Sequence, residues 1–442
     1  MSLIFSISGL RGVVDRDLNP DVVFRYARSF GKYLRKGRVV IGRDTRGSGK
    51  LYRRAVIRGL NSAGRSVIDL GIVPTPTVLF MVRRLKASGG IVITASHNPV
   101  QWNALKFVSS KGLFLSSAEF RRFAKRIVDD RDSGGRKYER VVTSTSGLKE
   151  HIEKIVATVK PVQDSLRVGV DAVNGAGSIG LPMVLEEMGC KVYRLNCRFA
   201  PDFPRKPEPT RENITALCRF VKSCKLDAGF ACDPDCDRLS VVDENGEAIG
   251  EENSLVLATD YVLSENEGKK LSAVTNLSTT ALMDYVTEEH DASLYRTRVG
   301  EANVVSKMKS MKALIGGEGN GGIIYPKINF TRDAMTGAAL IVKLLAARAM
   351  PLSEIMARYP KYYMVKRKLM IGREKFEERK ETIIDAFRGK LDCTDGVKIV
   401  GRNYWLHIRP SQTEHLVRVI GESRDRTQIE NYISKVKRIL YR

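Results

Sequence analysis

The chain has 442 residues, a length that excludes a single small domain and predicts about three to four domains. Because 43% of the residues are hydrophobic and 28% are charged, the composition predicts a folded chain. Its net charge is +24, but aromatic residues make up only 7% and are not interleaved with basic clusters, so a basic nucleic-acid-binding protein is a remote alternative. Apolar runs are too short to cross a membrane, and seven cysteines without repeated spacing indicate free thiols in the cytoplasm.

Short β-branched runs alternate with longer amphipathic stretches, which is the pattern of α/β units. Three predicted strands, at residues 38–43, 166–170 and 226–232, each lead into an aspartate, and these are Asp44, Asp171 and Asp233. Ligands of open α/β sheets gather at the carboxyl ends of strands. The repetition therefore predicts a weak threefold repeat of α/β domains with candidate sites at these ends.

Two breaks punctuate the pattern. Four prolines between Pro201 and Pro209 predict a connection rather than a helix or strand. A second break is expected at Tyr359-Pro360. Beyond it helix and strand patterns mix, and the chain finishes in a predicted amphipathic helix at residues 428–441.

The apolar run Gly89–Ile93 predicts a buried strand that delivers a serine, a histidine and an asparagine into the loop Thr94–Pro99. Ser96 lacks the G-x-S-x-G context of a hydrolase nucleophile, and His97 is its neighbour in sequence, which makes it a poor base for that hydroxyl. Acyl hydrolysis is therefore disfavoured. A serine that carries a phosphoryl group, held by a metal and basic side chains, fits this loop better.

Three alternate aspartates stand between two predicted strands, at 228–231 and 239–242. Asp233, Asp235 and Asp237 fall on one side of an extended segment, and clustered carboxylates without soft ligands favour Mg²⁺ or Ca²⁺. With Glu244 they match the ligand spacing of an EF-hand, but Arg238 replaces its required glycine and the flanks are not helices. A magnesium-binding loop between two strands is the better interpretation, and a solvated acidic turn without a bound ion is the alternative.

The segment from Gly175 to Gly180 satisfies G-x-G-x-x-G and precedes a predicted helix at 181–188. The next predicted strand, 191–195, is followed by Asn196 and Cys197 instead of the acidic residue that a dinucleotide site requires. A tight strand-to-helix turn explains the glycines, so a nicotinamide cofactor is disfavoured.

In this order the motifs resemble those of the α-D-phosphohexomutases, a family that includes phosphoglucomutase, phosphomannomutase and phosphoglucosamine mutase. The resemblance covers the whole chain and is carried by Gly9–Gly12, Gly42–Arg46, Val73–Pro76, Thr94–Pro99, Asp233–Arg238, Gly317–Gly322 and Arg409–Glu414 with Arg418. It implies three similar α/β domains, at residues 1–150, 151–250 and 251–361, and a smaller C-terminal α+β domain, at 362–442, around a central active-site cleft.

The resemblance implies that Ser96 is a phosphoserine and shares one Mg²⁺ with the three aspartates, Asp233, Asp235 and Asp237. A phosphoseryl group carries a charge of about −2. Further positive charge would come from Arg11, Lys106 and Arg238, and His97 would orient the loop or contact phosphate. Lys106 is the candidate base if neighbouring cations lower its pKa. Arg43 and Arg46 are expected to be structural ion-pair partners.

The implied reaction interconverts hexose 6-phosphate and hexose 1-phosphate by two phosphoryl transfers through a hexose 1,6-bisphosphate, which is intermediate and activator. The expected substrate contacts are Glu318, Asn320 and Glu301 for the sugar and Arg409, Ser411, Thr413 and Arg418 for the non-reacting phosphate. The protein is expected to be a monomer or a homodimer with a small-molecule substrate, and neither membrane nor nucleic acid is an expected partner.

Several positions depart from the family pattern. Asn320 and Gly322 replace a serine and a histidine of many bacterial members, and Glu301 replaces another histidine, so Glu301 becomes a candidate acid/base partner. Outside these positions, Ala104, Gln412 and His415 also differ. The loop Gly317–Gly322 resembles the archaeal-type branch, whose members are phosphoglucosamine mutases or broad phosphomannomutases and phosphoglucomutases. There Glu318 would accept hydrogen bonds from sugar hydroxyls or pair with the ammonium group of glucosamine, and glucosamine phosphate is the favoured substrate. A broad phosphomannomutase/phosphoglucomutase is the alternative, since Asn320 both donates and accepts hydrogen bonds.

Overall fold

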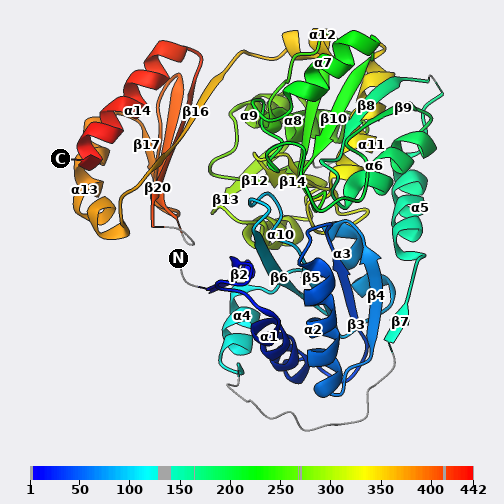
Figure 1. Cartoon of the computed structure of the whole chain (residues 1–442). Helices are drawn as coiled ribbons and strands as arrows, with labels where there is room; N and C mark the ends of the chain where they lie inside the picture. The colour runs from blue at the N-terminus through cyan, green and yellow to red at the C-terminus, as the bar shows by residue number, and fades with distance from the viewer. Residues whose placement is uncertain are drawn as a thin grey trace. The chain divides into compact units, whose positions relative to one another are not determined.

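The computed structural model describes residues 3–127, 141–163, 165–266, 268, 271–411 and 415–441 (Figure 1). The chain divides into two compact units, Met1–Tyr261 with Asn320–Ser353, and Val262–Gly319 with Glu354–Arg442. Within the described ranges, no helix has both the length and the apolar character needed to cross a membrane.

The first unit contains a seven-stranded sheet from whose middle the serine loop leaves. Its strand order is β1-β2-β6-β5-β3-β4-β7. The strands are β1 (Ile4–Ser6), β2 (Gly9–Val13), β3 (Val39–Arg43), β4 (Val67–Ile72), β5 (Gly89–Ile93), β6 (Trp102–Ser109) and β7 (Val141–Thr143). The accompanying helices are α1 (Pro20–Tyr33), α2 (Gly49–Ser62), α3 (Thr75–Arg84) and α4 (Ser117–Ala124). Strands β3, β4, β5 and β7 are parallel, whereas β6 runs antiparallel to β5 and β2.

Both faces of this sheet are buried because alternate residues of its central strands enter different cores. In β3, Val39 and Ile41 pack with α1 and α2, which lie side by side in Figure 1, whereas Val40 packs with α3. Nearly continuous apolar strands are typical of parallel sheets covered on both faces. Because β3 and β5 are parallel, the residues that follow them, Asp44 and Thr94–Pro99, emerge at the same edge.

A second sheet of the first unit delivers the aspartates. Its order is β11-β10-β8-β9, with β8 (Arg167–Asp171), β9 (Lys191–Leu195) and β10 (Ala228–Cys232) parallel and β11 (Leu239–Asp243) antiparallel to β10. The unit also contains α5 (Gly147–Val159), α6 (Gly177–Glu187), α7 (Thr215–Cys224), β15 (Gly322–Ile324) and α11 (Ala334–Arg348). Two further helices, α8 (Glu251–Ser264) and α12 (Leu352–Ala357), lie at the unit boundaries. The aspartate-rich loop joins β10 to β11 as a hairpin.

The second unit contains a parallel arrangement in the order β13-β12-β14 and a separate antiparallel sheet. The parallel strands are β12 (Ser272–Asn276), β13 (Ser293–Thr297) and β14 (Ile315–Glu318), accompanied by α9 (Leu282–Glu289) and α10 (Glu301–Met311). The antiparallel sheet has the order β16-β20-β19-β18-β17. It consists of β16 (Tyr363–Leu369), β17 (Lys390–Asp392), β18 (Val397–Val400), β19 (Tyr404–Pro410) and β20 (Val417–Ser423), with α13 (Arg373–Ala386) and α14 (Arg426–Tyr441) packed on one face.

Most predicted elements are confirmed. The strands expected at 38–43, 89–93, 166–170 and 226–232 are β3, β5, β8 and β10, and Pro201–Pro209 carries neither helix nor strand. The α/β fold class with a smaller C-terminal α+β part is also confirmed. The helix expected at 181–188 begins earlier, at Gly177, because the glycine motif forms its first turn. The exact four-domain division stays a prediction.

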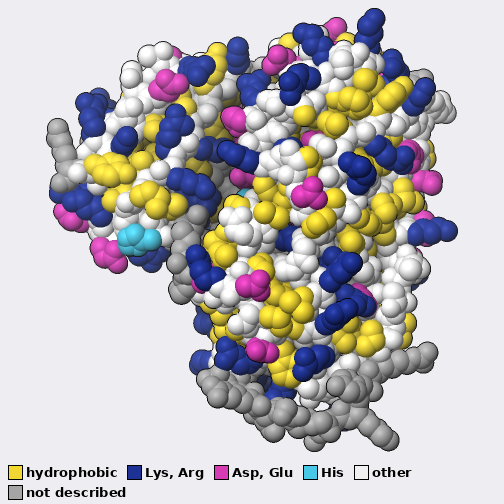
Figure 2. All heavy atoms as spheres, viewed as in Figure 1, with side chains coloured by type: hydrophobic (Ala, Val, Ile, Leu, Met, Phe, Trp, Pro, Cys, Tyr) yellow, Lys and Arg dark blue, Asp and Glu magenta, His cyan; other side chains and the backbone are white. Residues whose placement is uncertain are grey.

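The positive charge of the chain is unevenly distributed. Residues 3–127 contain 24 lysine and arginine residues against 6 aspartate and glutamate residues, a net charge of +18 out of +24. On the face drawn in Figure 2, lysine and arginine side chains are scattered rather than gathered into one block. The charge excess therefore belongs mainly to the segment that carries the serine loop, without a compact basic patch on this face.

A buried histidine lies within the second unit. His407 of β19 has 0% exposure, and its Nε2 lies 2.6 Å from the carbonyl oxygen of Asp395. A carbonyl only accepts, so Nε2 carries the proton and Nδ1 accepts from the Ser278 hydroxyl at 2.7 Å. Burial is the main cause that lowers the pKa of His407 to about 4. The imidazole is therefore neutral at pH 7.

We expect this histidine to make the second unit acid-sensitive. The pKa of His407 is lower in the folded protein than the value of 6.5 expected after unfolding. Stability is therefore fully present above pH 6.5 and is lost as pH falls towards 4, by about 3 kcal/mol. The measurement is the free energy of unfolding against pH for wild type and His407→Gln, with the exposed His415→Gln as control. Equal pH slopes for all three proteins would contradict the assignment.

Candidate phosphoryl-transfer and metal site

Ser96 is held in an unusual backbone conformation in the loop between β5 and β6. Its φ is +50°, in the left-handed region that non-glycine residues rarely occupy. The Ser96 amide donates to Thr94 Oγ1 at 2.9 Å, and Thr94 Oγ1 donates to Asp44 Oδ2 at 2.6 Å. Strained residues of this kind persist only where their surroundings determine them, and they cluster at functional sites.

The aspartate loop is a tight turn and not the extended segment expected from the i, i+2, i+4 spacing. Cys236 adopts φ +57°, which reverses the chain between Asp235 and Asp237. Asp233 Oδ1 accepts from the amides of Asp237 at 3.0 Å and Arg238 at 3.1 Å. The three carboxylates converge because the loop folds around the Asp233 side chain.

The two loops meet within the first unit. Ser96 Oγ donates to Asp233 Oδ2 at 2.7 Å, and one carboxylate oxygen of each aspartate lies within 4.8 Å of those of the other two. All three aspartates are almost fully buried. Glu244, the fourth position of the EF-hand spacing, instead bonds to Ser353, which agrees with the rejection of an EF-hand.

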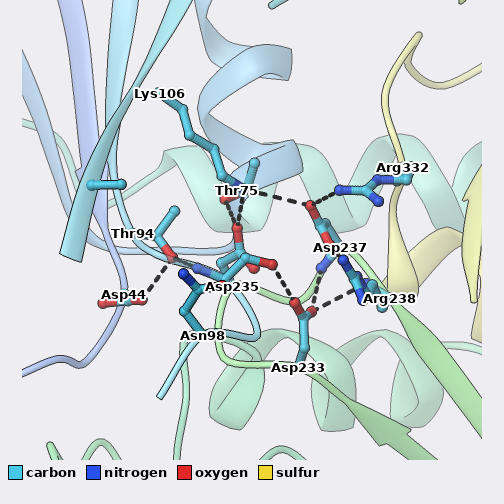
Figure 3. A network of polar contacts seen from close by, with 12 residues as sticks. Asp44, Thr75, Thr94, Asn98, Lys106, Asp233, Asp235, Asp237, Arg238 and Arg332 are labelled. Atoms are coloured by element: carbon cyan, nitrogen blue, oxygen red, sulfur yellow. Dashed lines mark hydrogen bonds and ion pairs between the residues drawn. The ribbon is translucent and has the colours of Figure 1, made fainter. Parts of the chain in front are cut away.

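Three cationic side chains, Lys106, Arg238 and Arg332, and the hydroxyl of Thr75 surround the aspartates, as Figure 3 shows. Lys106 Nζ lies 2.7 Å from Asp235 Oδ2 and 3.6 Å from Asp237 Oδ2. Arg332 Nη2 lies 2.6 Å from Asp237 Oδ2, and Thr75 Oγ1 donates to Asp235 Oδ2 at 2.6 Å. The side chains of Lys106, Arg332 and Thr75 come from β6, the loop before α11 and the first residue of α3.

The charges of the aspartates are distributed unequally. Burial raises the pKa of Asp233 well above the usual carboxyl value, and the charges of Asp235 and Asp237 raise it further. Burial also opposes ionisation of Asp235, but the Lys106 charge and hydrogen bonds from Asp233, Lys106 and Thr75 hold its pKa below the usual value. Without a cation between them, Asp233 therefore holds its proton to a higher pH than an ordinary carboxyl group does.

The donor set fits a hard divalent cation. Asp235 Oδ1 and Asp237 Oδ1 are buried and accept no hydrogen bond from the described residues. Unpartnered buried carboxylate oxygens are costly, and a cation is the natural partner for them. Cys236 does not compete as a ligand, because a Cβ placed on Gly177 would lie 2.9 Å from its sulfur and 2.8 Å from that of Cys232, which puts both thiols against the glycine.

The structure corrects one expectation about Lys106. Burial lowers the pKa of Lys106, but Asp235 and Asp237 outweigh burial, so the pKa lies above the ordinary value. The condition set for Lys106 as a base, a pKa lowered by neighbouring cations, is not met. A protonated Lys106 can donate to a phosphoryl oxygen but cannot accept a proton.

Positive charge gathers around His97. Burial lowers the pKa of His97 well below its usual value, and Arg238, Arg11 and Arg332 lower it further. Arg11 Nη1 donates to Asn98 Oδ1 at 3.4 Å, and Arg238 Nη1 pairs with Glu208 at 2.5 Å. A neutral imidazole among three guanidinium groups marks an environment suited to an anion.

The glycines of the G-x-G-x-x-G motif pack against the aspartate loop, and this packing accounts for them without a cofactor. A Cβ on Gly175 would lie 2.6 Å from the carbonyl oxygen of Pro234, and the Ala176 amide donates to that oxygen at 2.7 Å. Only glycine permits this approach, and Gly177 leaves room for the two thiols. The tight-turn interpretation of G-x-G-x-x-G is therefore the one that the contacts support.

The expected sugar contacts lie in and next to the second unit. Glu318, at the end of β14, is 5% exposed, and its Oε1 accepts from Asn276 Nδ2 at 3.0 Å and from the Gly300 amide at 2.9 Å. Glu301 follows Gly300 as the first residue of α10. Asn320 begins the stretch Asn320–Ser353, which belongs to the first unit.

The expected phosphate contacts lie at one end of the β19–β20 hairpin. Arg409 and Arg418 face each other across the two strands, and Ser411 donates its amide to the Leu416 carbonyl at 2.8 Å. Arg409 Nε lies 3.4 Å from Asp395 Oδ2, which also accepts from the Val299 amide. Thr413 lies outside the described residues.

Sequence reasoning missed several residues of the site. Arg332 stands alone between Thr331 and Asp333 without a motif, and only the fold brings it to Asp237. Thr75 belongs to the motif Val73–Pro76, but the sequence alone did not indicate its contact with Asp235. Arg46 pairs with Asp44 at 3.0 Å as expected, whereas Arg43 donates to the Asp44 carbonyl rather than to a carboxylate.

Comparisons with known proteins identify the family of the chain. Residues 2–132, 149–246 and 251–362 match the models for the alpha/beta/alpha domains I, II and III of phosphoglucomutase/phosphomannomutase. A phosphoglucomutase/phosphomannomutase of Thermococcus kodakarensis is 36% identical, with 98% of this chain and 97% of that protein covered. A probable phosphoglucosamine mutase of Methanopyrus kandleri is 34% identical, with 99% and 98% covered.

A solved structure is similar over nearly the whole length. The crystal structure of a phosphoglucomutase/phosphomannomutase family protein from Burkholderia thailandensis has a TM-score of 0.86 and 25% identity, covering 99% of this chain and 98% of that one. Sequence and fold agree, and the chain belongs to the α-D-phosphohexomutase family, whose members are mutases that act as intramolecular phosphotransferases.

Proposed function

We propose that the protein interconverts hexose 6-phosphate and hexose 1-phosphate through a phosphoserine at Ser96, with glucosamine phosphate as the preferred substrate. The observation that carries the proposal is the hydrogen bond of 2.7 Å from Ser96 Oγ to Asp233 Oδ2 in a buried carboxylate cluster. A serine hydroxyl at a candidate divalent-metal site, surrounded by Lys106, Arg238 and Arg332, has the chemistry required to carry and release a phosphoryl group.

Asp233, Asp235 and Asp237 are the residues that would hold Mg²⁺ together with an oxygen at Ser96, and the cation would offset negative charge on the phosphoryl group. Lys106 is protonated and buried, so it can donate to a phosphoryl oxygen where charge develops. Arg238 and Arg11 supply further positive charge, and His97 in its neutral form can contact the phosphate or orient the loop. Apart from Ser96, the side chains of the site would therefore act by positioning the phosphoryl group and stabilising its charge.

The proposed reaction consists of two phosphoryl transfers. A hydroxyl oxygen of the hexose phosphate loses its proton and forms a bond to the phosphorus on Ser96. The bond between that phosphorus and Ser96 Oγ breaks, Ser96 Oγ takes up a proton, and a hexose 1,6-bisphosphate results. After the bisphosphate reorients, Ser96 Oγ loses its proton and attacks the other phosphorus, and the departing sugar oxygen takes up a proton as the isomeric monophosphate leaves. Glu301 is the candidate acid/base partner for these proton transfers. The bisphosphate acts as the activator, because it also phosphorylates Ser96. Arg409, Ser411, Thr413 and Arg418 are proposed to hold the phosphate that does not react.

The preference for glucosamine phosphate rests on the Glu318 carboxylate. Glu318 Oε1 is fixed by Asn276 and the Gly300 amide, so the carboxylate has a defined orientation. A buried carboxylate pairs more strongly with an ammonium group than with a hydroxyl. Because relatives are named both phosphoglucosamine mutase and phosphoglucomutase/phosphomannomutase, broad activity on mannose and glucose phosphates is the second candidate.

The test compares initial rates on glucosamine, mannose and glucose 1-phosphates with Mg²⁺ and the matching bisphosphate. We expect the highest kcat/KM on glucosamine 1-phosphate, and a loss of about tenfold or more on that substrate alone in Glu318→Gln. Glu301→Gln is the matched comparison, because an acid/base partner would affect all three sugars alike. Equal rates on the three sugars would support the second candidate, and no turnover on any of them would refute the proposed function.

A further inference from the structure

The guanidinium group of Arg46 binds three carbonyls of the serine loop and the carbonyl of Trp102, which begins β6. The Arg46 side chain is 0% exposed, and Nε pairs with Asp44 Oδ2 at 3.0 Å. Nη1 donates to the carbonyls of Pro99 at 2.7 Å and Trp102 at 2.9 Å. Nη2 donates to the carbonyls of Ser96 at 2.6 Å and Asn98 at 2.7 Å. All five N–H donors of the guanidinium are therefore used.

These contacts constrain the loop at the point where its backbone is strained. The Ser96 carbonyl belongs to the residue with φ +50°, and the Ser96 amide is held from the other side through Thr94 and Asp44. Asp44 links the two halves, since its Oδ2 accepts from both Arg46 and Thr94. Both sides of the Ser96 backbone are thus tied to one Asp44–Arg46 pair.

The chemistry of the contact is specific to arginine. Four carbonyls and one carboxylate converge on a planar fork of five donors, whereas a lysine ammonium offers three donors from one atom. The hydrogen bonds of the Arg46 side chain go to backbone carbonyls and to Asp44, not to the Ser96 hydroxyl, and its guanidinium also lies 5.1 Å from the centre of the Phe203 ring. Arg46 therefore acts on the loop and has no direct part in the chemistry.

We propose that Arg46 is a positioning residue that sets the direction of Ser96 Oγ for phosphoryl transfer. The proposal rests on the proposed function of Ser96. It goes beyond an ion pair with Asp44, because the four carbonyl contacts determine where the serine loop lies relative to Asp233. Small displacements of a reacting atom cost as much as about 100-fold in rate, so loosening this loop would slow transfer while substrate binding persists.

The test is Arg46→Lys, with Arg65→Lys as matched control. Arg65 belongs to the same α/β region and donates to the carbonyls of Gly31 and Leu34, away from the serine loop. For Arg46→Lys we expect kcat to fall by about 100-fold with KM changed less than threefold, and faster amide hydrogen exchange in residues 95–102. For Arg65→Lys we expect kcat and exchange in that peptide to stay at the wild-type level.

A second variant guards against misfolding. Asp44→Asn combined with Arg46→Gln removes both buried charges together, so neither is left unpaired. It should fold and show the same fall in kcat and the same faster exchange. A kcat within threefold of wild type in either folded variant, or exchange in residues 95–102 no faster than in Arg65→Lys, would overturn the proposal. A wild-type protein without turnover or phosphate on Ser96 would instead refute the proposed function. The hydrogen-exchange comparison would still show whether Arg46 holds the serine loop in place.

Discussion

We expect Ser96→Ala to abolish bisphosphate-primed turnover, with a loss of about 10⁴-fold or more, because the other hydroxyl of the loop, on Thr94, donates to Asp44 and is not directed at the aspartate cluster. The fold should persist, since the loop backbone is held by Arg46 and, through Thr94, by Asp44, and these contacts remain when the hydrogen bond from Ser96 to Asp233 is lost. Alanine also meets about the same backbone strain at φ +50° as serine does.

The measurement is turnover on glucosamine 1-phosphate, with melting temperature and intact mass of the same preparation. Ser109→Ala is the control, because Ser109 ends β6, the strand that follows the serine loop, and its hydroxyl donates to the Leu113 carbonyl. Wild-type protein should gain one phosphate from the bisphosphate, and Ser96→Ala none. More than a tenth of wild-type turnover in Ser96→Ala would exclude Ser96 as the phosphoryl carrier.

The site was predictable where chemistry and strand patterning coincide. Asp233, Asp235 and Asp237 indicate a cation site because three neighbouring carboxylates between apolar strands repel one another unless positive charge lies among them. Ser96 could be singled out because a buried strand leads into it. In both cases the informative residue lies directly after an apolar strand, and the carboxyl end of a strand is where a sheet presents its ligand contacts.

The same pattern misled for other residues, because an aspartate after a strand has more than one use. Asp171 looks like Asp233 in sequence, yet it pairs with Arg205 at 2.8 Å and caps the turn to Val173. Asp44 likewise pairs with Arg46. Which strand-end aspartate meets a cation and which meets an arginine depends on residues distant in sequence, and spacing alone does not contain that information.

Protonation was the least predictable property. Sequence reasoning made Lys106 a candidate base only if neighbouring cations lower its pKa. The fold places Asp235 at 2.7 Å and Asp237 at 3.6 Å from its ammonium, and their charges outweigh both burial and Arg332. Arg332 reaches the cluster only because α11 begins beside it. The balance of charges in a buried site is set by distances of a few ångströms, which require the tertiary structure.

The aspartate cluster leads to a prediction with opposite signs for stability and activity. Asp233→Asn keeps an oxygen that can accept from the amides of Asp237 and Arg238 but removes one buried charge. We expect turnover to fall by about 100-fold or more, the scale on which losing one preorganised electrostatic contact slows an enzyme. We expect the metal-free protein, in contrast, to melt at a higher temperature than wild type at pH 7.

The sign of the stability change follows from the raised pKa of Asp233. A carboxyl whose pKa is higher in the folded than in the unfolded state stabilises the fold at low pH, and this stabilisation is lost as pH rises through the folded pKa. At pH 7 without metal, the wild-type cluster is therefore under electrostatic strain that asparagine relieves. Bound Mg²⁺ should relieve the same strain in wild type, so its melting temperature should rise on addition of Mg²⁺ while that of Asp233→Asn changes little.

The measurement is the melting temperature of each protein in a chelator and in Mg²⁺, at several pH values. Asp243→Asn is the control, since Asp243 is a buried aspartate that caps the turn after β11 and takes no part in the cluster. If Asp233→Asn gained as much from Mg²⁺ as wild type does, the cation would be held elsewhere. If Asp233→Asn were less stable than wild type in the chelator, repulsion among the three buried carboxylates would not destabilise the metal-free protein, and the prediction would be wrong.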